Sequence, residues 1–155
     1  MSIMSIGEIM TKKLEKINMS ASAQEAAKAM TEGNVSSLVV TDMNDKAIGI
    51  VTEQNLVRRV VANDVSSGKV NIQKIMFSPP VTIDANSSVE VAADIMIENK
   101  VKHLLVVENE DLNKPLGIIT TNDFVGYLKR TPNEPEHDDK KLHSIPTRTD
   151  TQSNQ

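Results

Sequence analysis

Thr120 and Asp123 are the residues of this sequence whose types and spacing best suit ligand chemistry. They lie between a short apolar stretch, residues 116–119, and an apolar run of helical character, residues 124–128. The start of a helix presents unpaired N–H groups and the positive end of the helix dipole, and both favour a phosphate. The Thr120 hydroxyl can add a donor, and the Asp123 carboxylate can accept from the paired hydroxyls of a ribose. This turn therefore suits a phosphorylated ribose.

The same two residues also have a purely structural explanation. Thr-x-x-Asp ahead of an apolar run is an acidic form of the helix capping box. The two roles are compatible, because a capping carboxylate can still hold a ligand. Gly117 would keep the preceding strand free of a side chain where a ligand or a neighbouring backbone comes close.

The pattern around Thr120 and Asp123 occurs twice in the chain. Residues 49–55 repeat it, with Thr52 in the place of Thr120 and Asn55 in the place of Asp123. A shift of 66 residues also superimposes upstream apolar positions: Ile9 on Ile75, Ala26 on Ala92 and Met30 on Met96. We therefore divide the chain into a first repeat, residues 7–66, and a second repeat, residues 67–130.

Each repeat is predicted to have the element order β-α-β-β-α. The first helix of each repeat has apolar residues at i, i+3, i+4 and i+7, as in Ala23 to Met30. The expected strands are residues 14–18, 38–40 and 48–51, then 81–83, 104–107 and 116–119. Their continuous apolar runs indicate burial on both faces. One repeat has too little surface to cover its sheet, so we expect the α+β repeats to pack together with pseudo-twofold symmetry.

Two helix ends have sequence signals in this prediction. Ser87 with Glu90 resembles a capping box at the start of the helix in the second repeat. Gly33 stands where a left-handed residue would end the helix of the first repeat.

The composition argues against several classes of protein. Cysteine is absent, which excludes disulfides, thiolate zinc sites and cysteine nucleophiles. The formal net charge of −4 disfavours a nucleic-acid partner. No apolar run approaches the ~20 residues of a membrane span, and no basic signal-peptide region is recognised, so a cytoplasmic protein is expected. P-loop, GxGxxG, HExxH and GxSxG motifs are absent, so we expect no enzyme and no metal site.

Residues 131–155 differ in character from the two repeats. They are polar and interrupted by proline, with Leu142 and Ile145 as their large apolar residues. We expect this segment to be a disordered tail.

Two copies of Gly-apolar-apolar-Thr-x-x-Asp/Asn in register, each with an upstream Ile-Met and an Ala-Ala-x-x-Met helix, resemble the cystathionine-β-synthase (CBS) domain pair, or Bateman module. The resemblance covers about residues 7–130. It implies a regulatory sensor that binds an adenosine-containing ligand, such as AMP, ADP, ATP or S-adenosylmethionine, in clefts between the repeats. It implies no obligatory cofactor. It also implies a homodimer formed through helix faces, for which the apolar candidates are Leu56, Val57, Val60, Phe124, Val125 and Leu128.

By the same resemblance, the cleft at Asp123 borrows residues from the other repeat. Ile118 would add an apolar contact there. The residues expected to flank the base are Thr11, Lys13, Leu14, Val35 and Ser36. Lys102 and His103, at the start of a strand, are the expected phosphate contacts. Each could instead be an ordinary solvated or strand-edge residue.

The cleft at Asn55 departs from the family pattern. An amide carries no charge and offers one acceptor oxygen. The expected lining of this cleft is Ile50, Thr52, Asn55, Pro79, Pro80, Val81, Val101 and Lys102. Because Ser36 and Ser37 stand in the sequence where Lys102 and His103 stand in the other repeat, we expect its phosphate end to be less basic. It is therefore the cleft expected to be weak, empty or used for another purpose.

These observations together predict a sensor of adenine nucleotides that modulates an unknown partner protein. One alternative is a ligand-independent scaffold whose helices bind a partner enzyme or transporter. Another is a small hydrolase or transferase. A thermal shift caused by nucleotides separates the sensor from the scaffold, and product formation would favour the enzyme.

Overall fold

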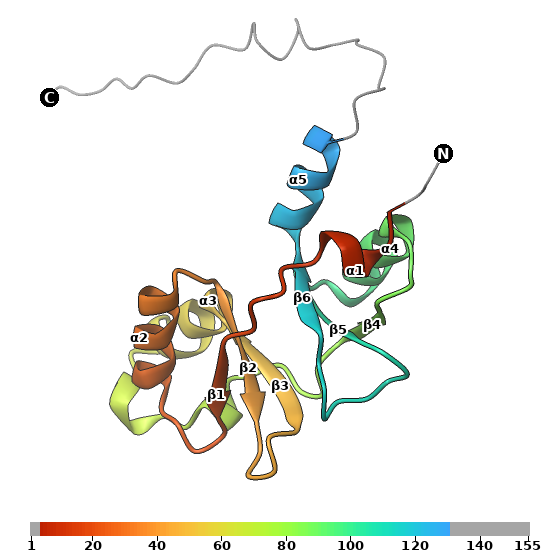
Figure 1. Cartoon of the computed structure of the whole chain (residues 1–155). Coiled ribbons are helices and arrows are strands. Elements are labelled where there is room, and N and C mark those ends of the chain that lie inside the picture. Colours follow the sequence, from red (N-terminus) through yellow and green to blue (C-terminus); the bar gives the residue numbers. More distant parts are fainter. Residues whose placement is uncertain (1–3, 131–155) are drawn as a thin grey trace, which may run out of the picture.

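The computed structural model describes residues 4–130, which form two lobes, each built on a three-stranded sheet (Figure 1). The first lobe has β1 (Lys16–Asn18), α2 (Ala23–Gly33), β2 (Ser37–Thr41), β3 (Ala47–Thr52), α3 (Glu53–Leu56) and a π-helical turn, η1 (Val57–Val61). The second has β4 (Thr82–Asp84), α4 (Val89–Asn99), β5 (His103–Val107), β6 (Gly117–Thr120) and α5 (Thr121–Arg130). The predicted order β-α-β-β-α is confirmed in both repeats. The expected tail, residues 131–155, lies outside the described residues.

The two sheets have the same topology and pack against each other. In each, the first strand runs parallel to the middle strand, and the middle strand runs antiparallel to the third. All five residues of β2 are buried, as continuous apolar runs predict. Leu38 and Val40 pack against the helices of their own lobe, whereas Val39 packs in a cluster with Leu105 and Val107 of β5. Alternate residues of the middle strands therefore fill two different cores.

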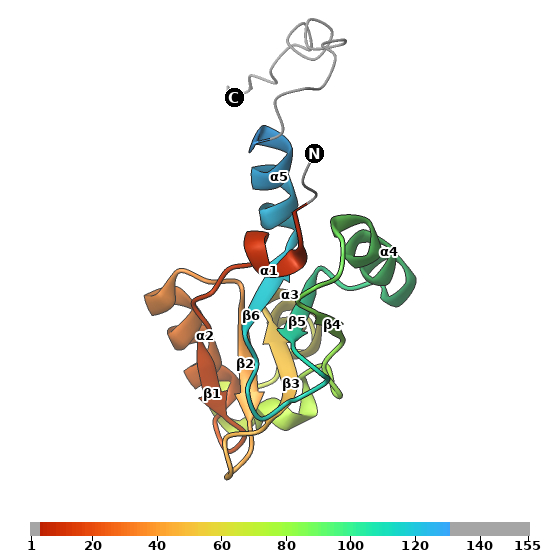
Figure 2. The same ribbon diagram turned by 45° about the vertical axis from the view of Figure 1, so that its right-hand side comes forward.

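Three short helices pack against the lobe that the other repeat forms, an exchange that the sequence did not predict. The helix α1 (Ile6–Ile9) precedes the first lobe but packs in the core of the second, beside β6 and α5 in both views (Figures 1 and 2). The 3₁₀ turns η2 (Ser67–Lys69) and η3 (Ile72–Lys74) precede the second lobe, yet Ile72 and Ile75 are buried in the first. Each sequence repeat therefore supplies apolar residues to the core of the other.

Backbone pairing fixes this exchange at equivalent positions. Thr11 exchanges two backbone hydrogen bonds of 2.9 and 3.0 Å with Ile118, and Phe77 exchanges two of 2.8 and 3.0 Å with Ile50. A Cβ at Gly117 would lie 2.6 Å from the carbonyl oxygen of Thr11. The expected close approach at Gly117 is therefore that of a neighbouring backbone.

Two helix ends differ from the sequence prediction. The cap of α4 is Ser88, whose hydroxyl accepts from the Val91 N–H at 3.2 Å, so Ser87 and Glu90 do not form the expected capping box. The helix α2 includes Gly33, and the left-handed residue that ends it is Asn34, with φ of 53°. Asparagine tolerates this conformation because its short polar side chain can bond locally.

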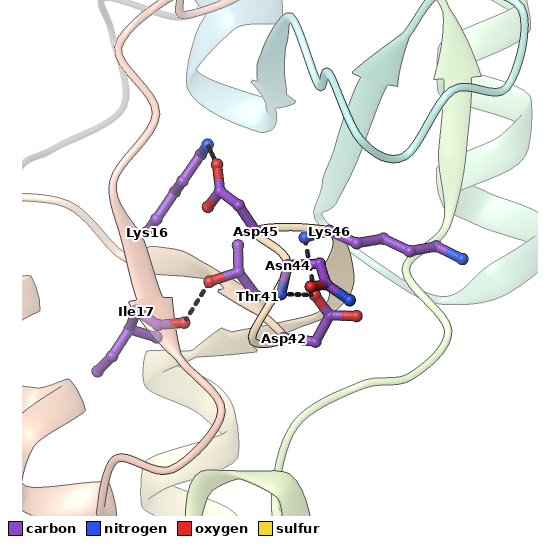
Figure 3. Close-up of polar contacts among 7 residues, drawn as sticks. All are labelled: Lys16, Ile17, Thr41, Asp42, Asn44, Asp45 and Lys46. Carbon is purple, nitrogen blue, oxygen red and sulfur yellow. Dashed lines mark hydrogen bonds and ion pairs between the residues drawn. The ribbon is translucent and has the colours of Figure 1, made fainter.

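The turn between β2 and β3 is closed by its own side chains (Figure 3). Asp42 Oδ1 accepts from the backbone N–H groups of Asn44 and Lys46 at 2.8 and 3.0 Å. Lys16 of β1 forms an ion pair of 3.1 Å with Asp45, which is in the left-handed region with φ of 66°. This end of the first sheet is thus held by turn chemistry.

Candidate functional site

The Thr120–Asp123 motif forms a helix cap and also contacts the other repeat. Asp123 Oδ2 accepts from the Thr120 N–H at 2.8 Å and from its hydroxyl at 3.3 Å. Asp123 Oδ1 accepts from the hydroxyl of Thr11 at 3.0 Å. One half of the expected capping box is therefore present, the bond from the Thr120 N–H to the Asp123 carboxylate. The carboxylate is also placed where the two repeats meet.

A cavity of about 210 Å³ lies beside Asp123. The expected residues that line it are Thr11, Lys13, Leu14, Val35, Ser36, Ile118, Thr120 and Asp123. The structure thus brings together eight of the ten residues assigned to this cleft. It adds residues that sequence reasoning missed: Glu15, Asn34, Ser37, Val39 and Asn122. Glu15 forms an ion pair of 3.1 Å with Lys13, so the single cation in this lining is already paired.

The Asn55 motif shares one bond with the Asp123 motif, from the threonine N–H to the side chain three residues later, with an amide in place of the carboxylate. The Thr52 N–H donates to Asn55 Oδ1 at 2.9 Å, and the Asn55 N–H donates to the Thr52 hydroxyl at 3.1 Å. This reciprocal pair is a capping box. One of the two lone pairs of the Asn55 side-chain oxygen is therefore used by the cap, and the other lone pair and the NH₂ group remain for a ligand.

A second cavity of about 200 Å³ lies beside Asn55. Of the residues expected there, Ile50, Thr52, Asn55, Val81, Val101 and Lys102 line it. Pro79 and Pro80 do not, and Phe77 takes that part of the wall. The basic residues around this cavity are Arg58, Arg59, Lys100, Lys102 and His103. The expectation that this cleft is the less basic one is therefore reversed.

Lys102 and His103 do not line the Asp123 cavity, which corrects their expected place. Each cavity takes the start of the middle strand from the opposite repeat. The start of β2, with Val35 and Ser36, lines the Asp123 cavity, so the start of β5 lines the Asn55 cavity. The sequence prediction also includes Lys102 in the Asn55 cleft, and the same rule, applied consistently, would have placed His103 there as well. It would also have found Lys100, the counterpart of Asn34 under the shift of 66.

A third hollow, of about 210 Å³, shares lining residues with both cavities at the helix starts. Its lining includes Thr52 and Thr120 together with Ser36 and His103. His103 Nε2 lies 3.0 Å from the Ser36 hydroxyl, a contact between the two repeats. Burial lowers the pKa of His103 below its ordinary value of 6.5, and the charge of Lys102 lowers it further. The neutral ring can accept from or donate to Ser36, according to its tautomer.

The family model of the CBS domain matches two segments of the sequence, residues 6–62 and 72–130. This chain belongs to the CBS-domain family. The two matches confirm the resemblance that the sequence motifs suggested.

Individual proteins and solved structures are also similar to this chain. An uncharacterized protein of Methanopyrus kandleri is 30% identical over 125 residues, which are 81% of this chain and 63% of that protein. The crystal structure of an uncharacterized conserved protein from Pyrococcus horikoshii has a TM-score of 0.76 at 30% identity, covering 88% of this chain and 99% of that one. The structure of a CBS domain protein from Pyrobaculum aerophilum, complexed with AMP, has a TM-score of 0.69 at 23% identity. The match covers 77% of this chain and 89% of that one. At that identity the likeness shows the fold alone.

Residues 4–130 contain neither a candidate metal cluster nor a helix that could span a membrane. No group of three or more His, Asp or Glu side chains in this part of the chain could hold a metal ion. No helix there is long and apolar enough to cross a membrane.

Proposed function

We propose that this CBS pair binds an adenosine-containing ligand between its repeats and thereby regulates a partner protein. The observation that carries the proposal is the composition of the Asp123 cavity, whose walls come from both repeats. Thr11 and Val35 belong to the first repeat, and Ile118 and Asp123 to the second. A ligand that touches both would favour one relative arrangement of the lobes, which is the differential affinity that regulation requires.

The chemistry of the Asp123 cavity suits a ribonucleoside. Asp123 accepts three hydrogen bonds, two at Oδ2 from Thr120 and one at Oδ1 from the Thr11 hydroxyl, and a carboxylate has about four acceptor positions in all. About one position therefore remains for a hydroxyl of a ribose. Leu14, Val35 and Ile118 supply apolar surface for a base in the same cavity. The AMP complex of the P. aerophilum protein shows that this fold can hold such a ligand.

Calorimetric titration with adenosine, AMP and S-adenosylmethionine, with guanosine as control, tests the proposal. We expect Asp123→Ala to weaken binding of adenosine by about ten- to a hundredfold, because a charge-assisted hydrogen bond contributes about 1.5–3 kcal/mol. Asn55→Ala should leave adenosine binding unchanged, since Asn55 lies in the other cavity.

Asp123→Asn is the matched control for the helix cap. The chain itself shows that asparagine can cap at this position of the motif, because Asn55 accepts from the Thr52 N–H at 2.9 Å. Asp123→Asn should therefore keep the fold and lose affinity for adenosine. Binding equal to that of the wild type would show that Asp123 serves only as a cap. A chain that no nucleoside or nucleotide stabilises against heat would favour the ligand-independent scaffold.

A further inference from the structure

The outer face of α4, called here the α4 face, combines carboxylates with exposed apolar side chains. Asp94 lies at its centre, because the other four members are three or four residues away from it along the helix. They are Glu90, Val91, Ile97 and Glu98, and all five side chains are exposed. Val91 is 45% exposed and Ile97 is 74% exposed, although the opposite side of the same helix fills a core. The α4 face is therefore both acidic and apolar.

The carboxylates of the α4 face are not neutralised within the part of the chain that the structure describes. Within residues 4–130 the two ion pairs lie in the first lobe, and neither involves α4. Glu90, Asp94 and Glu98 form two pairs of like charges four residues apart, and such pairs destabilise a helix. A cationic segment lying on this face would relieve the repulsion, and its apolar residues could cover Val91 and Ile97.

The equivalent helix of the first repeat lacks this chemistry. Under the shift of 66 residues, Ile97 corresponds to Thr31 and the central Asp94 corresponds to Lys28. The turn η2 also lies at this face of α2, where Lys28 and Ser67 line one hollow. The α4 face stays exposed, and α4 lies on the side of the second lobe away from α2 in both views (Figures 1 and 2). The acidic and apolar character is therefore a property of this one helix and is not repeated.

The chain beyond α5 contains a segment of complementary chemistry. Residues 140–148, called here the basic segment, are Lys-Lys-Leu-His-Ser-Ile-Pro-Thr-Arg. They carry three cations and two large apolar residues and no carboxylate, against the three carboxylates and two large apolar residues of the α4 face. Glutamate and aspartate residues stand ahead of the basic segment, in residues 134–139, so the charges of the tail are sorted into blocks.

The basic segment begins close enough to α4 to reach it. The helix α5 ends at Arg130, and its residue Phe124 packs against the same core as Ile95 of α4. Lys140 is ten residues beyond Arg130, and ten residues of chain span at most about 35 Å. A helix of 11 residues, such as α4, is about 16 Å long. The linker therefore allows the basic segment to lie along α4.

We propose that the basic segment docks on the α4 face, with its cations beside Glu90, Asp94 and Glu98 and its apolar residues against Val91 and Ile97. The contact lies outside both clefts and does not rest on the proposed function. Docking shields α4 from other cationic segments. It makes the tail an intramolecular competitor of any partner that approaches α4 with similar chemistry.

The chemistry of the α4 face predicts weak docking. Exposed ion pairs contribute little, and a short linker gives an effective concentration in the millimolar range. A surface contact with a millimolar dissociation constant is then occupied about half of the time. Half occupancy roughly doubles the weight of the folded state, which shifts the melting temperature by only about one or two degrees. The docking is therefore a surface contact and not a part of the fold.

A nitroxide label at Thr149→Cys tests the docking on the full-length protein. The chain has no cysteine of its own, so the label takes one position, directly after the basic segment. We expect NMR at low salt to show the amide signals of Val91, Asp94 and Ile97 broadened more than those of their counterparts on α2. Raising the salt concentration should remove most of this difference, because exposed charges are screened.

Substitutions on both sides of the contact locate it. Glu98→Gln should lower the docking equilibrium constant roughly two- to fivefold, the loss of one exposed ion pair. The double variant Lys140→Gln, Lys141→Gln should lower it further. The matched control is Glu32→Gln, which removes the same charge from the equivalent position of α2 and should leave the broadening of α4 unchanged.

Three results would overturn the proposal. The first is broadening that is absent from α4 or equal on α2 and α4. The second is equal weakening by Glu98→Gln and Glu32→Gln, which would show attraction to charge in general. The third comes from mixing label-bearing chains without ¹⁵N with ¹⁵N chains without the label. If α4 is broadened as much in this mixture as within one chain, the occupant is the tail of a second copy. No nucleotide enters these measurements, so they can fail while the proposed function stands.

Discussion

Replacing Gly117 by alanine should destabilise the protein, because this glycine lies where two backbones meet. A Cβ at Gly117 would stand 2.6 Å from both the Thr11 carbonyl oxygen and the Met10 sulfur. The flexible Met10 side chain can move away. The Thr11 oxygen cannot move without cost, because it accepts from the Ile118 N–H at 3.0 Å.

The size of the effect follows from the two ways in which the structure can respond. If the contact is kept, the added methyl group overpacks the site, at a cost of about 1–3 kcal/mol. If the segment at Thr11 moves away, its two backbone hydrogen bonds to Ile118 are lost, at about 1 kcal/mol each. Both routes predict that Gly117→Ala lowers the free energy of unfolding by about 2 kcal/mol. Movement of Thr11 would also displace part of the wall of the Asp123 cavity, so adenosine binding should weaken in the same variant.

Urea unfolding followed by circular dichroism measures the change, and Gly126→Ala provides the control. A Cβ at Gly126 in α5 would meet its nearest neighbour, Arg130 Nη1, at an ordinary 3.8 Å. Alanine is better than glycine inside a helix, so Gly126→Ala should raise the free energy of unfolding by roughly 0.5–1 kcal/mol. The same midpoint for Gly117→Ala and the wild type would refute the argument from close approach.

Three other predictions concern pH, association and the C-terminal segment. The lowered pKa of His103 means that the unfolded chain takes up a proton near pH 6.5 while the folded chain does not, so the free energy of unfolding should fall as the pH drops from 7 through 6.5. Urea unfolding of His103→Gln should show a smaller fall, and an unchanged fall would contradict the assignment. We expect a homodimer, because α5 has no buried residue and Val57 and Val125 are both 58% exposed; light scattering that gave the monomer mass of 17.0 kDa at tens of micromolar would exclude it. A chain that ends at Arg130 should melt within a degree or two of full length, since we expect no fold contribution from residues 131–155; a large drop would mean that this segment docks on the CBS pair.

The fold could be predicted from the sequence largely because its strands are buried on both faces. The continuous apolar run from Leu38 to Val40 leaves little alternative to a central strand. The doubled motif then fixed the repeat and the order of the elements. The helix ends were harder to predict, because Ser87 and Ser88 are adjacent and either could cap α4. The backbone geometry selects Ser88.

The sequence pattern could not predict the exchange of the short helices, and the reason is physical. A repeat shows which segments are equivalent, but two equivalent cores accept either copy of an apolar segment such as Ile6 to Ile9. The same ambiguity misplaced Lys102 and His103. Both errors concern which repeat a segment contacts, and the three-dimensional structure resolves both.

The exchange between the lobes also sets the order in which a growing chain can complete its structure. The core of the first lobe lacks Ile72 and Ile75 until the start of the second repeat has been synthesised. The contacts of the segment just after α1 are completed much later, because the Thr11 hydroxyl bonds to Asp123, 112 residues further along the chain. Such distant contacts form slowly and leave apolar surface exposed in the meantime. A nascent chain therefore carries Ile6 and Ile9 without their core partners until residues 83–119 of the second lobe have been synthesised, and a gene cut between the repeats would give two halves that each lack part of their core.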